Sequence, residues 1–123
     1  MINGFEKETA NLNEYERDTL LPIVAGWLKQ TNADRPIINR NATQWLKRNG
    51  YNCSEARFRK IVSTIRLECL VENVIATSKG YYVSDDAEEI ADYIQSLRER
   101  AGAINAIADA LCKQGSKVEA TLF

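Results

Sequence analysis

The spacing of apolar side chains in the first half of the chain predicts helices separated by short loops. The first helix is expected from Asn13 to about Gln30, because apolar residues recur on one helical face. Asn13 and Glu16 have the spacing of a capping box at its start. Pro22 lies within this stretch, where it either kinks the helix or marks its first turn. The loop that follows contains Pro36, which disfavours helix in the residue before it.

Two more helices are predicted, over residues 41–49 and 54–70, and a tight turn joins them. Gly50 follows the second helix, where a C-terminal cap favours glycine. Asn52 and Glu55 have the spacing of a second capping box at the start of the third helix. The buried stripe expected on this third helix consists of Phe58, Ile61, Val62, Ile65 and Cys69.

The second half of the chain predicts a β-hairpin and one long helix. The segments VIAT (74–77) and YYV (81–83) favour strands, and SKG between them supplies the turn, with Lys79 near its tip. Asp85 or Asp86 is expected to cap a final helix of about 28 residues, since acidic residues suit a helix start. A heptad pattern runs along that helix through Ile90, Ile94, Leu97, Ala101, Ile104, Ala108 and Leu111.

The order helix, helix, tight turn, helix, hairpin, helix predicts a mainly α fold with a small β-hairpin. This order is typical of a winged helix-turn-helix, here with a long C-terminal helix. The expected organisation is a flexible arm (1–12), the winged domain (13–100), an extension of the closing helix (101–114) and a flexible tail (115–123). The heptad pattern favours a homodimer formed through the C-terminal helix.

Composition narrows the classes of function. The chain has 123 residues, no histidine and three cysteines, which argues against histidine-based catalytic sites, zinc sites and a disulfide framework. The glycines are isolated, so no phosphate-binding loop is present. We therefore expect no enzyme, no cofactor and no metal, and buried or half-buried thiols at Cys53, Cys69 and Cys112. The polar N-terminus and the lack of long apolar runs predict neither a signal peptide nor a membrane span, hence a cytoplasmic protein.

Charge is segregated along the chain. Residues 35–79 carry nine basic and three acidic side chains, whereas both flanking segments are acidic. A basic face of this kind matches the phosphate backbone of double-stranded DNA. The third helix would be the recognition helix, the second would contact the backbone, and the hairpin would add Lys79. The side chains predicted to contact DNA are Arg40, Thr43, Gln44, Lys47, Arg48, Ser54, Arg57, Arg59, Lys60, Ser63, Thr64 and Lys79.

Other interpretations of these residues stay open. Basic side chains on a helix often form only a solvated face. Glu55 would repel phosphate unless it accepts from a cytosine amino group or closes the capping box, and the capping box is favoured. The larger aromatic side chains either stack on bases or belong to the core, and core packing is favoured for the two tryptophans. The aromatic candidates are Trp27, Trp45, Tyr51, Tyr81 and Tyr82.

The segment from Ile65 to Ile104, with its SKGYYV hairpin, acidic helix start and YIQSLRERAGAI helix, resembles small winged-helix proteins of phages and prophages. NGYNCSEARFRKIVSTIR is similar to their recognition-helix region. The resemblance implies DNA binding in transcription control or DNA replication in a bacterial host cell, with Arg57, Arg59, Lys60 and Lys79 facing DNA.

The chain ends in EATLF, which resembles the terminal peptides that dock on sliding clamps, with Leu122 and Phe123 as apolar anchors. A tail whose Leu122 and Phe123 fold back onto the core is the alternative. The rival to DNA binding is therefore a protein-interaction adaptor with the same fold, which this peptide would recruit to a sliding clamp.

Overall fold

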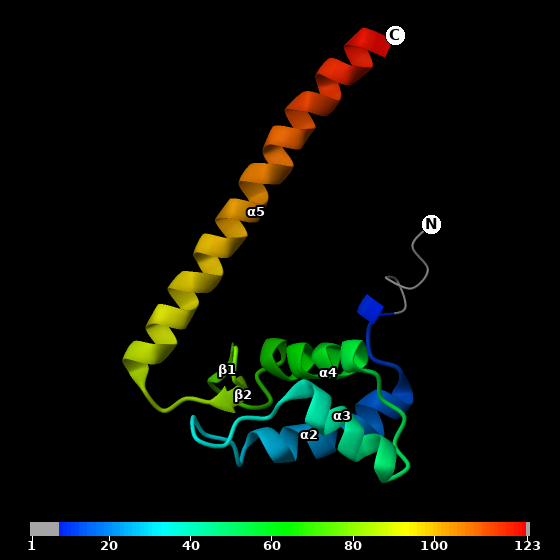
Figure 1. Cartoon of the computed structure of the whole chain (residues 1–123), viewed down its shortest axis with the longest axis vertical. Helices are drawn as coiled ribbons and strands as arrows, with labels where there is room; N and C mark the ends of the chain where they lie inside the picture. The colour runs from blue at the N-terminus through cyan, green and yellow to red at the C-terminus, as the bar shows by residue number, and fades with distance from the viewer. Residues whose placement is uncertain (1–7, 123) are drawn as a thin grey trace. The chain divides into compact units, whose positions relative to one another are not determined.

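The computed structural model describes residues 8–122, and it describes side chains through residue 115. Figure 1 shows helices and one small antiparallel hairpin, which confirms the predicted mainly α class. Two compact units meet between Asp85 and Asp86. The first unit contains η1 (Glu16–Leu20), α2 (Leu21–Leu28), α3 (Asn39–Arg48), α4 (Glu55–Leu67), β1 (Val74–Thr77) and β2 (Gly80–Val83), and the second unit contains α5 (Ala87–Leu122).

The first helical stretch begins with the predicted capping box. The amide of Glu16 donates to Asn13 Oδ1 at 2.8 Å, and the amide of Asn13 donates to Glu16 Oε1 at 3.0 Å. The π-helix η1 follows and passes into α2, with the amide of Leu21 donating to the carbonyl of Glu16. Pro22 lies in the first turn of α2, where a missing N–H costs little. The helical stretch begins before Pro22, so Pro22 lies where the π-helix η1 passes into α2 and does not mark the first turn of the whole stretch.

Helix α3 ends at the predicted glycine cap. Gly50 has a φ of +85°, a conformation that side chains with a Cβ rarely adopt. The amide of Tyr51 donates to the carbonyl of Leu46 at 2.8 Å, and the amide of Gly50 donates to that of Lys47 at 3.2 Å. These two bonds form a Schellman motif, which turns the chain sharply between α3 and α4.

Helix α4 begins with a different cap from the predicted one. Ser54 is extended, and its Oγ accepts from the amide of Arg57 at 3.1 Å. The predicted capping box between Asn52 and Glu55 is wrong, because Ser54 occupies the cap and Glu55 is the first residue of the helix. Glu55 still lies at the positive end of the helix dipole, which favours a carboxylate.

The C-terminal end of α4 comes earlier than predicted. Cys69 has a φ of +55°, and the amides of Cys69 and Leu70 donate to the carbonyls of Arg66 and Ile65. This is a second Schellman motif, with cysteine where glycine is usual. The predicted burial of Cys69 is wrong, because the cap turns its side chain out of the helical stripe and leaves it exposed.

The hairpin forms over the predicted residues, with Ile75 opposite Tyr82 in an antiparallel register. Its second strand also pairs with the loop before α3: the amides and carbonyls of Ile37 and Tyr81 exchange two hydrogen bonds of 2.8 Å. Gly80 makes this approach possible. It has a φ of +123°, and a Cβ there would lie 2.3 Å from the carbonyl oxygen of Ile37. The hairpin is thereby fixed to the helical core.

The core of the first unit lies where α2, α3 and α4 meet. Apolar side chains from all three helices and from both strands are buried there, as the periodicity predicts. Asn39, at the start of α3, donates from Nδ2 to the carbonyl of Glu55 at 3.0 Å and so links the starts of α3 and α4. The largest fully buried side chains are Phe58, Leu20, Leu28, Leu46, Ile61, Ile65, Val24 and Val62.

Helix α5 makes up the second unit. Asp86 caps it, since its Oδ1 accepts from the amides of Glu88 at 3.0 Å and Glu89 at 3.4 Å. The predicted end near residue 114 is too early, because the helix continues to Leu122. The boundary predicted at residue 100 falls inside this one continuous helix.

Candidate nucleic-acid interface

Helix α4 has one face in the core and one polar face outside it. Phe58 and Ile65 are fully buried. Positions 59, 60 and 63 lie on other sides of the helix, since each residue advances about 100° around the axis. Arg59 is exposed, and Lys60 and Ser63 are half-buried. Neither Arg59 nor Lys60 forms an ion pair with the residues that the structure describes. Two cations therefore remain available to an external partner.

A second basic face lies on α3. Four polar side chains lie along one side of this helix, because three of them follow the first by four, seven and eight residues. They are Arg40, Gln44, Lys47 and Arg48. All four side chains are exposed. The buried side of α3 carries Leu46, so the basic face points away from the core.

The hairpin contributes one more cation. Lys79 is exposed in the turn between β1 and β2, and its amide donates to Thr77 Oγ1 at 3.1 Å. The other end of the hairpin is fixed, because the amide of Val83 donates to Thr31 Oγ1 at 2.9 Å. Lys79 is thus carried on a short, anchored turn.

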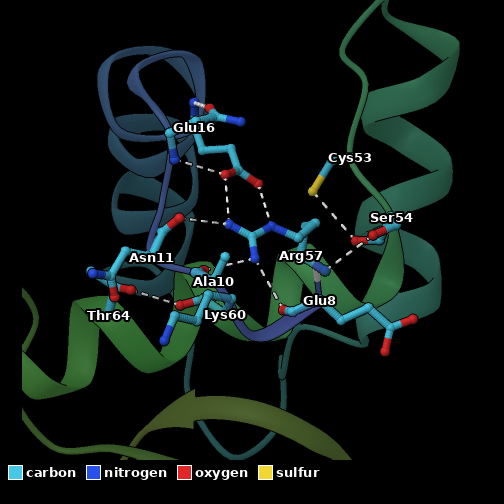
Figure 2. Close-up of polar contacts among 10 residues, drawn as sticks. Glu8, Ala10, Asn11, Glu16, Cys53, Ser54, Arg57, Lys60 and Thr64 are labelled. Carbon is cyan, nitrogen blue, oxygen red and sulfur yellow. Dashed lines mark hydrogen bonds and ion pairs between the residues drawn. The ribbon is translucent and has the colours of Figure 1, made fainter. Parts of the chain in front are cut away.

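Arg57 was predicted to contact DNA, but its guanidinium is engaged within the chain. Figure 2 shows it between Glu16 and the backbone of the N-terminal arm. Nε donates to Glu16 Oε2 at 2.7 Å, and Nη2 donates to Glu16 Oε1 at 2.7 Å. This bidentate ion pair is largely buried, with 17% of the Arg57 side chain and 6% of the Glu16 side chain exposed. Arg57 is therefore left out of the interface that we propose.

The same guanidinium also holds the arm. Nη1 donates to the carbonyls of Glu8 at 3.0 Å and Ala10 at 2.8 Å, and Nη2 donates to that of Asn11 at 3.2 Å (Figure 2). All three nitrogens of Arg57 thus have acceptors. The arm was predicted to be flexible over residues 1–12, whereas its described part, from Glu8, is fastened to α4.

The ion pair shifts the pKa of both partners. The hydrogen bond from Arg57 lowers the pKa of Glu16, against a smaller opposing effect of burial. The hydrogen bond to Glu16 raises the pKa of Arg57. Burial, with a further contribution from the charge of Glu16, raises the pKa of the Cys53 thiol to about 11. Cys53 is therefore a thiol at neutral pH and a poor nucleophile.

Three other predicted contact residues have local structural roles. Thr43 and Thr64 are buried, and each hydroxyl donates to a carbonyl one turn earlier in its own helix. Ser54 is the α4 cap. Because a Thr methyl or hydroxyl facing the core cannot reach DNA, we also omit Thr43 and Thr64 from the proposed interface.

The arm borders the basic face of α4. A hollow of about 250 Å³ is lined by Glu8, Thr9, Ala56, Arg59 and Lys60. The two cations of α4 thus lie beside an arm that carries a carboxylate. Access of a polyanion to this part of α4 depends on where the arm lies.

An apolar groove that the sequence analysis missed lies on the side of α3 next to the basic face. It has a volume of about 370 Å³, and Trp27, Pro36, Ile37, Ile38, Asn41, Ala42 and Trp45 line it. Trp27 and Trp45 pack edge to face, with ring centroids 5.2 Å apart. Trp27 is half-buried against the core, but Trp45 is 42% exposed, so its predicted place in the core is wrong. Of the tyrosines weighed for base stacking, Tyr82 is buried and Tyr81 packs beside Phe58.

Cysteine placement differs from the prediction at two positions. Cys53 is half-buried as expected, whereas Cys69 and Cys112 are exposed. Among the described residues, no group of three or more cysteine and carboxylate side chains is arranged to hold a metal ion. Within the same part of the chain, no helix is long and apolar enough to cross a membrane.

No protein-family model matches the chain, and comparisons with curated proteins and with solved structures also give no match. The predicted clamp-binding anchors lie outside the described residues: the side chain of Leu122 is not described, and neither is any part of Phe123.

Proposed function

We propose that this chain is a non-enzymatic DNA-binding protein whose first unit is a winged helix-turn-helix. In this assignment α3 and α4 are the helix-turn-helix, α4 is the recognition helix, and the β1–β2 turn is the wing. The pairing of Ile37 with Tyr81 supports it, because this isolated β-bridge ties the hairpin to the loop before α3.

The particular kind that we propose is a phage or prophage protein acting in transcription control or DNA replication, in the cytoplasm of a bacterial host cell. The support is the sequence resemblance described above, centred on the SKGYYV hairpin and the helix after it. The glycine of this hairpin, Gly80, has a physical reason to be glycine, since a side chain there would collide with the backbone of Ile37.

One observation carries the proposal: cations without ion-pair partners among the described residues lie on three neighbouring elements of one unit, and all of them are exposed except the half-buried Lys60. They are Arg40, Lys47 and Arg48 on α3, Arg59 and Lys60 on α4, and Lys79 on the hairpin. In contrast, Arg17 and Arg57 are paired with Glu68 and Glu16. Unpaired cations lose no internal contact when they bind phosphate, so they suit a polyanionic partner.

The test is a fluorescence-anisotropy titration of labelled duplex DNA at low salt. The proposal expects binding by the wild type and a loss of about tenfold or more for the double variant Arg59→Ala, Lys60→Ala, because each removed phosphate contact weakens binding. Arg57 is left unchanged, because its loss would break the ion pair with Glu16 and confuse folding with binding.

A matched double variant removes the same charge elsewhere in the first unit. Lys29 and Arg35 are exposed and follow α2, which packs on α4 from the core side (Figure 1). Lys29→Ala, Arg35→Ala should bind nearly as well as the wild type. Equal losses in both variants would show that only net charge matters, and no binding by the wild type would remove the proposal.

The second candidate is an adaptor that binds a partner protein. The apolar groove around Trp27 and Trp45 favours it, since exposed aromatic side chains in a hollow are typical of protein contacts. The sliding clamp remains the partner proposed for the terminal peptide. Trp45→Ala separates the two functions: it should abolish the binding of a partner protein in the groove, whereas it should leave duplex binding by the α3–α4 face unchanged.

A further inference from the structure

Helix α5 exposes large apolar side chains along its length. Exposure reaches 66% at Ile104, 62% at Ile107 and 59% at Leu111. Between residues 101 and 112 the only charged side chain is Asp109. A helix that is apolar on most sides is normally covered by other helices. The second half of α5 therefore has the composition of a packed helix and the exposure of a free one.

The apolar positions of α5 alternate in size. One series with a spacing of seven contains only large side chains, and these are Ile90, Leu97, Ile104 and Leu111. The other series begins at Ile94 and then contains only small residues, namely Ala101, Ala108 and Gly115. Together the two series form the heptad seam, with large residues on one side of each turn and small residues on the other.

This alternation distinguishes the two orientations of a helix pair. In a parallel pair of identical helices each series faces itself, so alanine would meet alanine and leave space. In an antiparallel pair each series faces the other, so Ala101 meets Ile104 and Ala108 meets Leu97. Close-packed interiors favour large against small. We propose that α5 binds the α5 of a second copy of this chain as an antiparallel pair.

Charge supports the same orientation. The first turn of α5 is acidic, with Glu88 and Glu89, and Lys113 lies near the other end of the described side chains. An antiparallel pair brings the acidic start of one helix near the basic end of the other and opposes their dipoles. A parallel pair would place the acidic starts side by side, which is unfavourable.

The seam also selects a register. With Ala101 opposite Ile104 of the partner copy, every seam position between Ile90 and Gly115 has a partner. In a pair shifted by one heptad, Ala101 would face Leu97. That register would place the Arg98 side chains of the two copies beside each other, and likewise the two Arg100 side chains. In the selected register Arg100 lies beside Ile107 instead, and its aliphatic stem would cover that exposed side chain.

The experiment measures distances between spin labels in the full-length chain. In a background with Cys53→Ser, Cys69→Ser and Cys112→Ala, a single cysteine is placed at Asp92 or at Ala106, both of which lie on the outer side of the seam. The antiparallel pair predicts axial separations of about 30 Å for labels at Asp92 and about 10 Å for labels at Ala106, from the helical rise per residue. A parallel pair predicts the same short distance at both positions.

Sedimentation velocity on the same samples establishes the assembly state. A dimer with unequal distances supports the proposal, whereas a monomer at all concentrations or a dimer with equal distances overturns it. Ile104→Asp should abolish the dimer, and the matched change Ala106→Asp on the outer side should leave it intact. Because α5 is a separate unit from the proposed DNA-binding face, failure of DNA binding would leave this outcome unchanged.

Discussion

The two units of the chain differ in how far their apolar side chains are buried. In the first unit Phe58, Leu46 and Ile61 are fully buried by α2, α3 and α4, whereas α5 leaves Ile104 and Leu111 more than half exposed. Both regions have a regular apolar pattern, so periodicity alone does not separate them. The first unit supplies its own covering surfaces, whereas the pairing with a second copy that we propose would supply one for α5.

The largest expected effect is on the free energy of unfolding of the first unit, and it compares a substitution in each of the two units. Phe58→Ala should destabilise the first unit by about 3–5 kcal/mol, because it leaves a large cavity in a closely packed core. Ile104→Ala removes a side chain that the single chain leaves 66% exposed, and it should leave the unfolding of the first unit unchanged. Urea unfolding followed by tryptophan fluorescence checks both, since Trp27 and Trp45 belong to the first unit. Similar losses in the two variants would mean that the units are not independent.

A smaller effect tests the ion pair between Glu16 and Arg57, whose guanidinium also holds the arm. Glu16→Gln should cost about 2–3 kcal/mol at neutral pH, because Arg57 keeps its burial but loses its charged partner. The pKa of Glu16 is lowered in the folded chain, so its contribution is complete above its ordinary pKa and is lost as pH falls through the lowered value. Unfolding curves from pH 7 to pH 3 should therefore converge for wild type and variant. A constant difference across this range would contradict this role for the ion pair.

The smallest effect concerns the cap of α4. Ser54→Ala should destabilise the first unit by about 1 kcal/mol, whereas Asn52→Ala should change its stability little. Thermal unfolding of the two variants measures the difference. A larger loss for Asn52→Ala would restore the capping box that the sequence predicted.

Local features of the fold could be predicted from the sequence, because neighbouring residues determine them. The Asn13–Glu16 box and the Gly50 cap each depend on a few residues within one or two turns. The early end of α4 could not be predicted in the same way, since Cys69 adopts a positive φ that glycine usually provides. Nor did local pattern place the cap of α4, since Ser54 occupies it in place of the predicted Asn52.

The candidate interface was predictable in its elements but not in each side chain. Arg59 and Lys60 follow from charge and helical position, and Lys79 follows from its place in the hairpin turn. The structure leaves these side chains without ion pairs among the described residues. Arg57 has the same residue type on the same helix, yet it pairs with Glu16, 41 residues earlier. Only the tertiary packing of η1 on α4 brings these two side chains together.

The measurement that tests the proposed function most directly is the salt dependence of duplex DNA binding. Log affinity falls with log salt with a slope of about −0.9 for each phosphate that a protein neutralises. The proposed interface predicts a steep slope for the wild type. For Arg59→Ala, Lys60→Ala it predicts a shallower slope, by the amount that about two lost phosphate contacts account for. A wild-type chain that does not bind duplex DNA at low salt, or a variant with the same slope as the wild type, would contradict the DNA-binding function.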